Sequence, residues 1–199
     1  MNIDKMIRFL VLILFLTACN ANDTFLPEPK LVAESQLVMI EQIADKEYSK
    51  TDIEIGRAFF YEANNVITIE ITLENMEPNT SKAVHIHQGT VELPGRHWNQ
   101  GSFNSFCNER SLGELWAKPF AGDVGNVDID ENGHGQFILS TDLWAINSND
   151  NKDILNRAII IHQNAEDFLT ECDQNHTHDM PHMNQKIAGG MIISLVLEE

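Results

Sequence analysis

The stretch Val66-Ile67-Thr68-Ile69-Glu70-Ile71-Thr72-Leu73 decides the fold class, because apolar and polar residues alternate along its whole length. A period of two places the apolar side chains on one face, which is typical of a β-strand with one buried side. Phe59-Phe60-Tyr61 precedes this run, and the turn-forming Glu62-Ala63-Asn64-Asn65 lies between them. This order predicts a β-hairpin.

Other runs along the chain also favour strands. Residues 37–43 fit a strand or a helix, and their β-branched content beside the hairpin favours a strand. Residues 126–129 and 136–139 flank a glycine-rich tip and predict a second hairpin. Apolar runs at 158–162 and 191–197 predict two more strands, and no long segment of helical period competes with them.

Many short strands without a clear helix predict an all-β fold, a Greek-key β-sandwich or barrel of about eight antiparallel strands. The chain has 199 residues, enough for one substantial domain, which we expect at residues 34–199. Two long loops, 88–122 and 163–186, separate predicted strands. Loops of this length in a compact domain commonly carry function.

The first residues have the composition of a secretion signal. Lys5 and Arg8 precede a short apolar run, and small residues lead to Cys19. The run is too short for a permanent membrane helix. We therefore expect a signal peptide at 1–18, followed by a polar tether at 19–33 that contains two prolines.

The sequence Leu16-Thr17-Ala18-Cys19 resembles the lipobox of bacterial lipoproteins. The resemblance implies that Cys19 becomes the lipidated first residue of an exported protein anchored to a bacterial membrane. Asn20 resembles the residue of lipoproteins sorted to the outer membrane, which implies the periplasmic face. The alternative is an ordinary cysteine near a plain cleavage site.

The net charge bears on the possible partners of the protein, and the remaining cysteines bear on a disulfide. The chain has 13 basic and 30 acidic side chains, a formal net charge of -17, which argues against nucleic acid as a partner. Besides Cys19 it contains Cys107 and Cys172. In an exported protein such a pair favours a disulfide over two free thiols, and the bridge would close a loop of about 65 residues.

Four histidines lie at predicted strand ends or in the loops beside them. His85 and His87 flank one aliphatic residue, so both rings project from the same face of a strand. Imidazole is a common ligand of copper and zinc, and His97 and His162 could complete the site. The alternatives are surface histidines at 85 and 87 and a hydrogen-bonded core histidine at 162.

These histidines lie in motifs that resemble the copper/zinc superoxide dismutase family. The motifs occur in the family's order and cover roughly residues 34–197: Val84-His85-Ile86-His87, Gly95-Arg96-His97-Trp98-Asn99, Gly122-Asp123-Val124-Gly125-Asn126-Val127, Ile160-Ile161-His162 with the following Glu166-Asp167, and Ile187-Ala188-Gly189-Gly190-Met191-Ile192.

The resemblance implies copper bound by His85, His87, His97 and His162, with superoxide as substrate. Cu(II) accepts four nitrogens and Cu(I) prefers fewer, so His97 would be the ligand released on reduction. Glu166 is a candidate for orienting a metal-bound histidine from outside the ligand set.

The departures from the family concern the zinc ligands and the residue that guides the superoxide anion to copper. Asp123 remains as a remnant zinc ligand, but Phe120 stands three residues before it and no other histidine lies between His97 and Asp123. The usual zinc site is therefore absent, as in copper-only relatives. Lys186 takes the place of the family's anion-guiding arginine, and a lysine lacks that residue's donor fork.

Two further departures from the family concern the charge of residues 163–185, before Lys186, and a cysteine of the final strand. No Lys or Arg occurs from 163 to 185, so we expect slower, less salt-steered turnover. Gly189 stands where the family has its disulfide anchor, so Cys107 and Cys172 would tie the two loops by another route.

Residues 176–183, His-Thr-His-Asp-Met-Pro-His-Met, are unusually rich in metal-ligating side chains. A solvated loop is the plain interpretation. Otherwise one or two of the rings of His176, His178 and His182 complete a second metal site with His97 and Asp123, or the segment captures and hands over copper.

The leading hypothesis is thus an exported, lipid-anchored copper superoxide dismutase. The alternative is a periplasmic copper-binding or copper-transfer lipoprotein with little turnover, for which a copper donor protein is a further candidate partner.

Overall fold

The computed structural model describes residues 28–100, 120–166 and 184–195, and these contain nine β-strands and no helix. No helix in these ranges is therefore long and apolar enough to cross a bilayer. The strands are β1 (Lys30–Ala44), β2 (Glu47–Ala63), β3 (Val66–Leu73), β4 (Ser81–His87), β5 (Asp123–Asp128), β6 (Gly135–Thr141), β7 (Ala158–His162), β8 (Lys186–Met191) and β9 (Ile193–Ser194).

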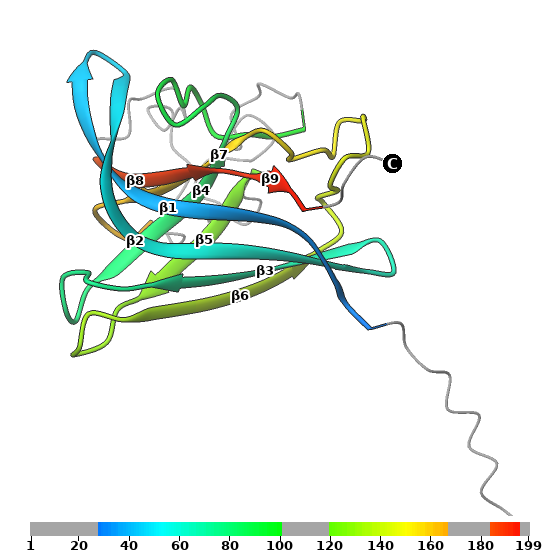
Figure 1. The fold of residues 1–199 in the computed structure, drawn as a ribbon, viewed down its shortest axis with the longest axis horizontal. Helices are drawn as coiled ribbons and strands as arrows, with labels where there is room; N and C mark the ends of the chain where they lie inside the picture. Colours follow the sequence, from blue (N-terminus) through cyan, green and yellow to red (C-terminus); the bar gives the residue numbers. More distant parts are fainter. Residues whose placement is uncertain (1–27, 101–119, 167–183, 196–199) are drawn as a thin grey trace, which may run out of the picture.

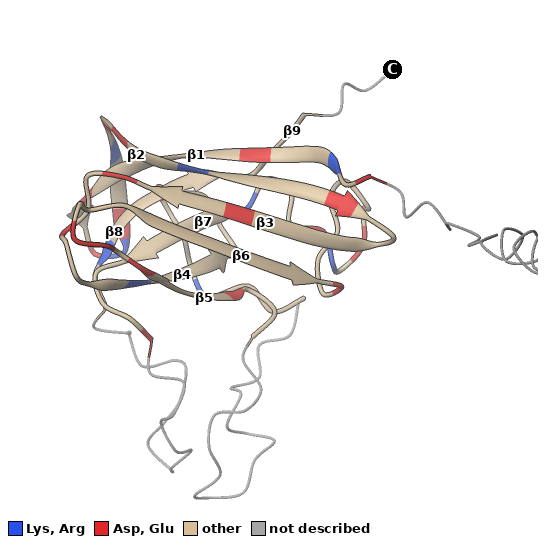
Figure 2. Ribbon diagram, turned by 90° about the horizontal axis from the view of Figure 1, so that it is seen from below, with Lys and Arg blue, Asp and Glu red and all other residues tan. Residues whose placement is uncertain are grey.

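The strands form one sheet that curves into a nearly closed barrel (Figure 1). The order is β5-β4-β7-β8-β1-β2-β3-β6, with β9 paired to β1, and every strand pair is antiparallel. Seen from below, the strands surround a common interior, with acidic positions on several of them (Figure 2). The all-β prediction is confirmed.

The hairpin predicted from the opening stretch is present as β2 and β3. Ala63 pairs with Val66, so the connection is the two residues Asn64 and Asn65. Both have positive φ, 53° and 61°, which is the conformation of the type I′ turn that suits the twist of paired strands. Along β3 alternate residues are buried, with Ile67 and Ile69 among them, as the period of two requires.

The second predicted hairpin is wrong in its pairing. Strands β5 and β6 flank the expected turn, but β5 pairs with β4 and β6 with β3. Between them only one isolated bridge forms, Ile129 with Gly135. The ring of Phe137 occupies the seam, because a Cβ on Gly125 would lie 2.8 Å from its Cζ. Side-chain packing therefore closes the barrel where a backbone ladder was expected.

The end of the chain also differs from the strand predicted at 191–197. The longer strand is β8, which begins at Lys186, and only the short β9 follows it among the described residues. The family resemblance indicated this strand through the motif Ile187-Ala188-Gly189-Gly190-Met191-Ile192, whereas its two glycines weaken the local strand signal. They allow close packing, since a Cβ on Gly190 would lie 2.1 Å from the carbonyl oxygen of Gln36. At the other end β1 begins at Lys30, four residues before the expected domain start.

The barrel has a main core inside and a smaller one outside. On β4, Val84 and Ile86 face the main core, and on β7, Ile159 and Ile161 do the same. Ala158 and Ile160 face outward into a small cluster with Ile40 and Val91, covered by part of the 88–94 loop. Because side chains alternate, the outer face of β4 and β7 also carries the histidines.

Candidate metal centre

The structure brings His85, His87, His97 and His162 together. One ring nitrogen of each lies within 4.8 Å of the others. All four side chains are buried, with exposures between 0% and 8%. In the described ranges this is the one group of three or more potential metal ligands.

Neighbouring strands place three of the rings. Strands β4 and β7 pair directly, with His85 opposite Ile160 and His87 opposite Ala158. His162 is the last residue of β7, so it lies on the same outer face. The cluster therefore depends on the register between two strands distant in sequence.

The fourth ring, that of His97, lies in the loop that follows β4. Gly89 N–H donates to the carbonyl of Pro94, which folds the loop back, and an isolated bridge joins His97 to His87. Trp98 N–H then donates to the carbonyl of Ile86 at 2.8 Å. Trp98 itself is buried in the main core and so anchors His97 at its position.

Acceptors outside the cluster fix two of the imidazole tautomers. His87 Nδ1 lies 3.1 Å from the carbonyl of Gly95, and His162 Nδ1 lies 3.0 Å from the carbonyl of Asn184. A carbonyl only accepts, so each Nδ1 carries the proton and each Nε2 keeps a lone pair. The two Nε2 atoms lie 3.4 Å apart, as expected of nitrogens that face a common point.

Burial also favours the neutral form of His87, the form that can bind a metal ion. The pKa of His87 is lowered well below 6.5, chiefly by burial and then by the neighbouring charges of His97, His162 and Lys186. Four buried imidazoles are a donor set that suits copper or zinc. The residues present therefore fit a metal ion on the chemistry of their donors.

Asp123 holds His97 from behind. Its Oδ1 lies 2.9 Å from His97 Nδ1, and its Oδ2 accepts the backbone N–H of Phe120 at 2.8 Å. Phe120, at the position of a missing zinc ligand, thus contributes its backbone to the network. The carboxylate predicted as a remnant zinc ligand thus contacts His97 directly, and its role toward zinc stays a prediction.

Glu166 lies beside His85, with Oε2 3.7 Å from the ring Nε2. Its side chain is largely buried, at 11% exposure, so a carboxylate here acts on the ring with little screening by water. The distance is that of an ion pair rather than a hydrogen bond, and the role of Glu166 in orienting a metal ligand stays a prediction.

Lys186 begins β8 directly opposite His162. Its ammonium lies 5.8 Å from the centroid of the Tyr48 ring, within the range of a cation–π contact. Burial lowers the pKa of Lys186. The sequence analysis did not single out Tyr48, which lies near the start of β2, distant in sequence from Lys186, and belongs to no motif.

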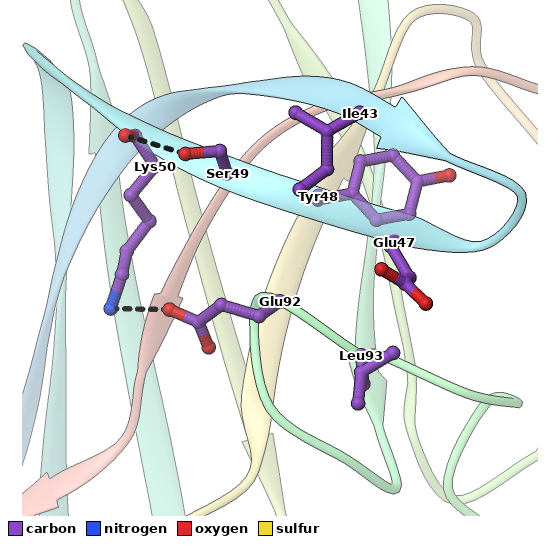
Figure 3. Close-up of a pocket in the computed structure, with 7 residues that line it drawn as sticks. All are labelled: Ile43, Glu47, Tyr48, Ser49, Lys50, Glu92 and Leu93. Atoms are coloured by element: carbon purple, nitrogen blue, oxygen red, sulfur yellow. Dashed lines mark hydrogen bonds and ion pairs between the residues drawn. The ribbon is translucent and has the colours of Figure 1, made fainter.

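Tyr48 also lines a groove together with Ile43, Glu47, Ser49, Lys50, Glu92 and Leu93 (Figure 3). None of the four histidines is among these lining residues. The groove has a volume of about 550 Å³ and runs between the tip of the β1–β2 hairpin and the 88–94 loop. Tyr48 N–H donates to the carbonyl of Glu92, and Lys50 pairs with the Glu92 carboxylate at 2.9 Å. These contacts fix the hairpin tip against the loop that leads to His97.

The remaining predicted residues lie outside the described ranges: Cys19, Cys107, Cys172, His176, His178 and His182. Their lipidation, disulfide and metal-binding roles stay predictions. The sequence analysis did not find two backbone groups that orient the histidines, the carbonyls of Gly95 and Asn184. Backbone acceptors have no side-chain signature, so a pattern of residue types could not have found them.

The fold and the site together define a class, a nearly closed antiparallel β-barrel whose outer face carries a buried four-histidine cluster able to bind a metal ion. The family model of copper/zinc superoxide dismutase (SODC) matches residues 54–192. The chain belongs to this family.

Two curated relatives come from Aquifex aeolicus (strain VF5). Superoxide dismutase [Cu-Zn] 1 is 25% identical over 121 residues, covering 59% of this chain and 71% of the relative. Superoxide dismutase [Cu-Zn] 2 is 24% identical over 121 residues, covering 59% and 70%. The family is therefore clear, while the sequence distance is large.

Solved structures show the same fold. A SOD-like protein from Bacillus subtilis has a TM-score of 0.56 at 20% identity, covering 82% of this chain and 97% of that one. The clock protein EA4 has a TM-score of 0.57 at 18% identity, covering 83% and 96%. At these identities the likeness concerns the fold alone.

Proposed function

We propose that this protein is a copper-dependent superoxide dismutase in which His85, His87, His97 and His162 hold the metal. The observation that carries the proposal is the convergence of four buried imidazole nitrogens within 4.8 Å. Family membership supports superoxide as the substrate. Copper supplies the one-electron chemistry when bound: superoxide is oxidised to oxygen in one half-reaction and reduced to peroxide in the other.

The protein's own residues prepare this site in three ways. The carbonyls of Gly95 and Asn184 keep His87 and His162 in the tautomer that presents Nε2. Asp123 holds His97 from its Nδ1 side. Lys186 offers a positive charge near the histidines, where it attracts the superoxide anion as a point charge without an arginine's fork.

The hydrogen bonds of Asp123 support our proposal that the site holds copper without zinc. Both of its oxygens are hydrogen-bonded within the protein, one to His97 and one to the backbone of Phe120. This arrangement supports a copper-only centre in which a carboxylate, rather than a zinc ion, supports the fourth histidine.

We also propose that the enzyme is exported and lipid-anchored through Cys19, on the periplasmic face of a bacterial outer membrane. The support is the sequence of residues 1–19. Metabolic labelling with a fatty-acid analogue tests it, with Cys19→Ser as the control that should remove the label.

The test of function is metal content together with activity. The purified protein should bind copper, and superoxide removal should appear on copper addition and disappear in the His85→Gln/His87→Gln variant. Protein that binds no copper, or binds it without removing superoxide, overturns the proposal.

A second candidate is a copper-binding or copper-transfer lipoprotein with little turnover. It is favoured by Lys186, which stands in place of an arginine and rests on the ring of Tyr48. Replacing His176, His178 and His182 together separates the two functions. A transfer protein should lose bound copper or its delivery to an acceptor, whereas a plain enzyme should keep both its copper and its rate.

A further inference from the structure

Two asparagine side chains hold the short segment that follows β7. The Asn184 amide brackets Asn164: its Oδ1 accepts the Asn164 N–H at 2.8 Å and its Nδ2 donates to the Asn164 carbonyl at 2.8 Å. Asn126 brackets Glu166 in the same way, at 2.8 and 2.9 Å. Each side chain thus reproduces the paired hydrogen bonds of a β-ladder.

The two ends of this segment touch different histidines. At one end His162 Nδ1 donates to the backbone carbonyl of Asn184 at 3.0 Å. At the other end Glu166 Oε2 lies 3.7 Å from His85 Nε2. Asn184 is therefore bonded to one metal-ligand candidate by its backbone and to the segment that carries Glu166 by its side chain.

The middle of the segment is fixed as well. The ammonium of Lys82, only 2% exposed, donates to the carbonyl of Gln163 at 2.8 Å. Gln163 N–H donates to the carbonyl of Gln185, and Ala83 N–H donates to the carbonyl of Asn164. These bonds join the segment to β4 on one side and to the start of β8 on the other.

The chemistry of the bracket requires an amide. Asn164 presents one donor and one acceptor, and a side chain that satisfies both needs an acceptor and a donor about as far apart as those of the backbone. Aspartate keeps only the acceptor, and alanine keeps neither. The backbone carbonyl of residue 184 accepts the His162 Nδ1–H. Without an amide side chain at 184, the backbone that carries this carbonyl would lose its side-chain hydrogen bonds to Asn164.

We propose that Asn184 is a positioning residue of the metal centre: by clamping Asn164 it fixes the carbonyl that orients His162 and the segment that presents Glu166 to His85. This inference rests on the proposed metal site. It adds to that proposal the residue that couples two of the four ligands.

The first test needs no metal. In long-range ¹H–¹⁵N NMR spectra of the metal-free protein at a pH where the rings are neutral, His162 should show one tautomer with the proton on Nδ1. Asn184→Ala should give a mixture, Asn184→Asp an intermediate result, and Asn151→Ala, in an exposed loop, no change. Asn126→Ala should perturb the His85 ring instead of His162. A His162 ring with the same tautomer in all variants overturns the inference.

The second test uses copper. Asn184→Ala should weaken Cu(II) affinity by about tenfold in a chelator competition and change the electron paramagnetic resonance spectrum, as loss of outer-shell support commonly does. Asn151→Ala should match the wild type. A wild-type protein that binds no copper overturns the proposed function, while the NMR result still decides the inference. Affinity and spectra unchanged in Asn184→Ala and Asn184→Asp overturn the role of Asn184.

Discussion

Asp123 is joined directly to His97, with 2.9 Å between the carboxylate Oδ1 and the ring Nδ1. The carboxylate is fully buried, and its second oxygen accepts the N–H of Phe120. An anion so placed keeps the imidazole proton on Nδ1 and strengthens the opposite nitrogen as a ligand.

Asp123→Asn should therefore weaken copper binding by about tenfold, because the amide replaces one of two acceptors with a donor. Chelator competition measures the change. Asp128→Asn, on the exposed end of the same strand, is the matched control and should have no effect. If the wild type binds zinc beside copper and Asp123→Asn loses only the zinc, Asp123 is a zinc ligand and this prediction is wrong.

Lys186→Gln should lower kcat/KM for superoxide by about tenfold and flatten its dependence on salt, because a local positive charge raises the encounter rate of an anion. Lys186→Arg should keep or raise the rate. Pulse radiolysis at several ionic strengths measures both. Lys46→Gln, which removes a charge from the exposed β1–β2 turn, controls for net charge. An equal loss in the two glutamine variants would contradict a specific role of Lys186.

Tyr48→Leu should have a smaller effect in the same direction, since it removes the aromatic face under the Lys186 ammonium. Tyr48→Phe keeps that face and should behave as the wild type in the same assay. Equal rates in the leucine and phenylalanine variants would show that the ring does not position the charge.

Gly190→Ala should destabilise the barrel by about 3 kcal/mol, because the new Cβ would lie 2.1 Å from the backbone oxygen of Gln36, which cannot move without opening the strands. Gly189→Ala should cost less, since the nearest atom is the mobile end of Ile160. Urea unfolding of the metal-free proteins measures both. The reverse ranking would mean that β8 does not pack as described.

Acid should destabilise the metal-free protein. The pKa of His87 is lowered well below 6.5, mainly by burial. Between that lowered value and 6.5 the unfolded chain binds more protons than the folded one, so the free energy of unfolding rises with pH. The contribution is complete above 6.5 and is lost as the pH falls, with a slope of up to about 1.4 kcal/mol per pH unit for one proton.

Urea unfolding at pH 5 and pH 7.5, with a chelator present, measures this slope. His87→Gln removes the titrating ring and should show a shallower dependence. An equal slope in the two proteins would assign the effect to other groups.

The sequence by itself determined the strands whose signal is local. Alternation marks β3, the asparagine pair marks the turn before it, and His85-Ile86-His87 places two rings on one face, because a strand's geometry repeats every two residues. Tertiary structure decided the rest. The β5–β6 seam closes through Phe137 against Gly125, and β8 passes through glycines. His97 meets Asp123, and Asn184 meets His162, across loops and strands distant in sequence. These contacts depend on pairing between remote segments and on backbone carbonyls, and neither has a local pattern of residue types.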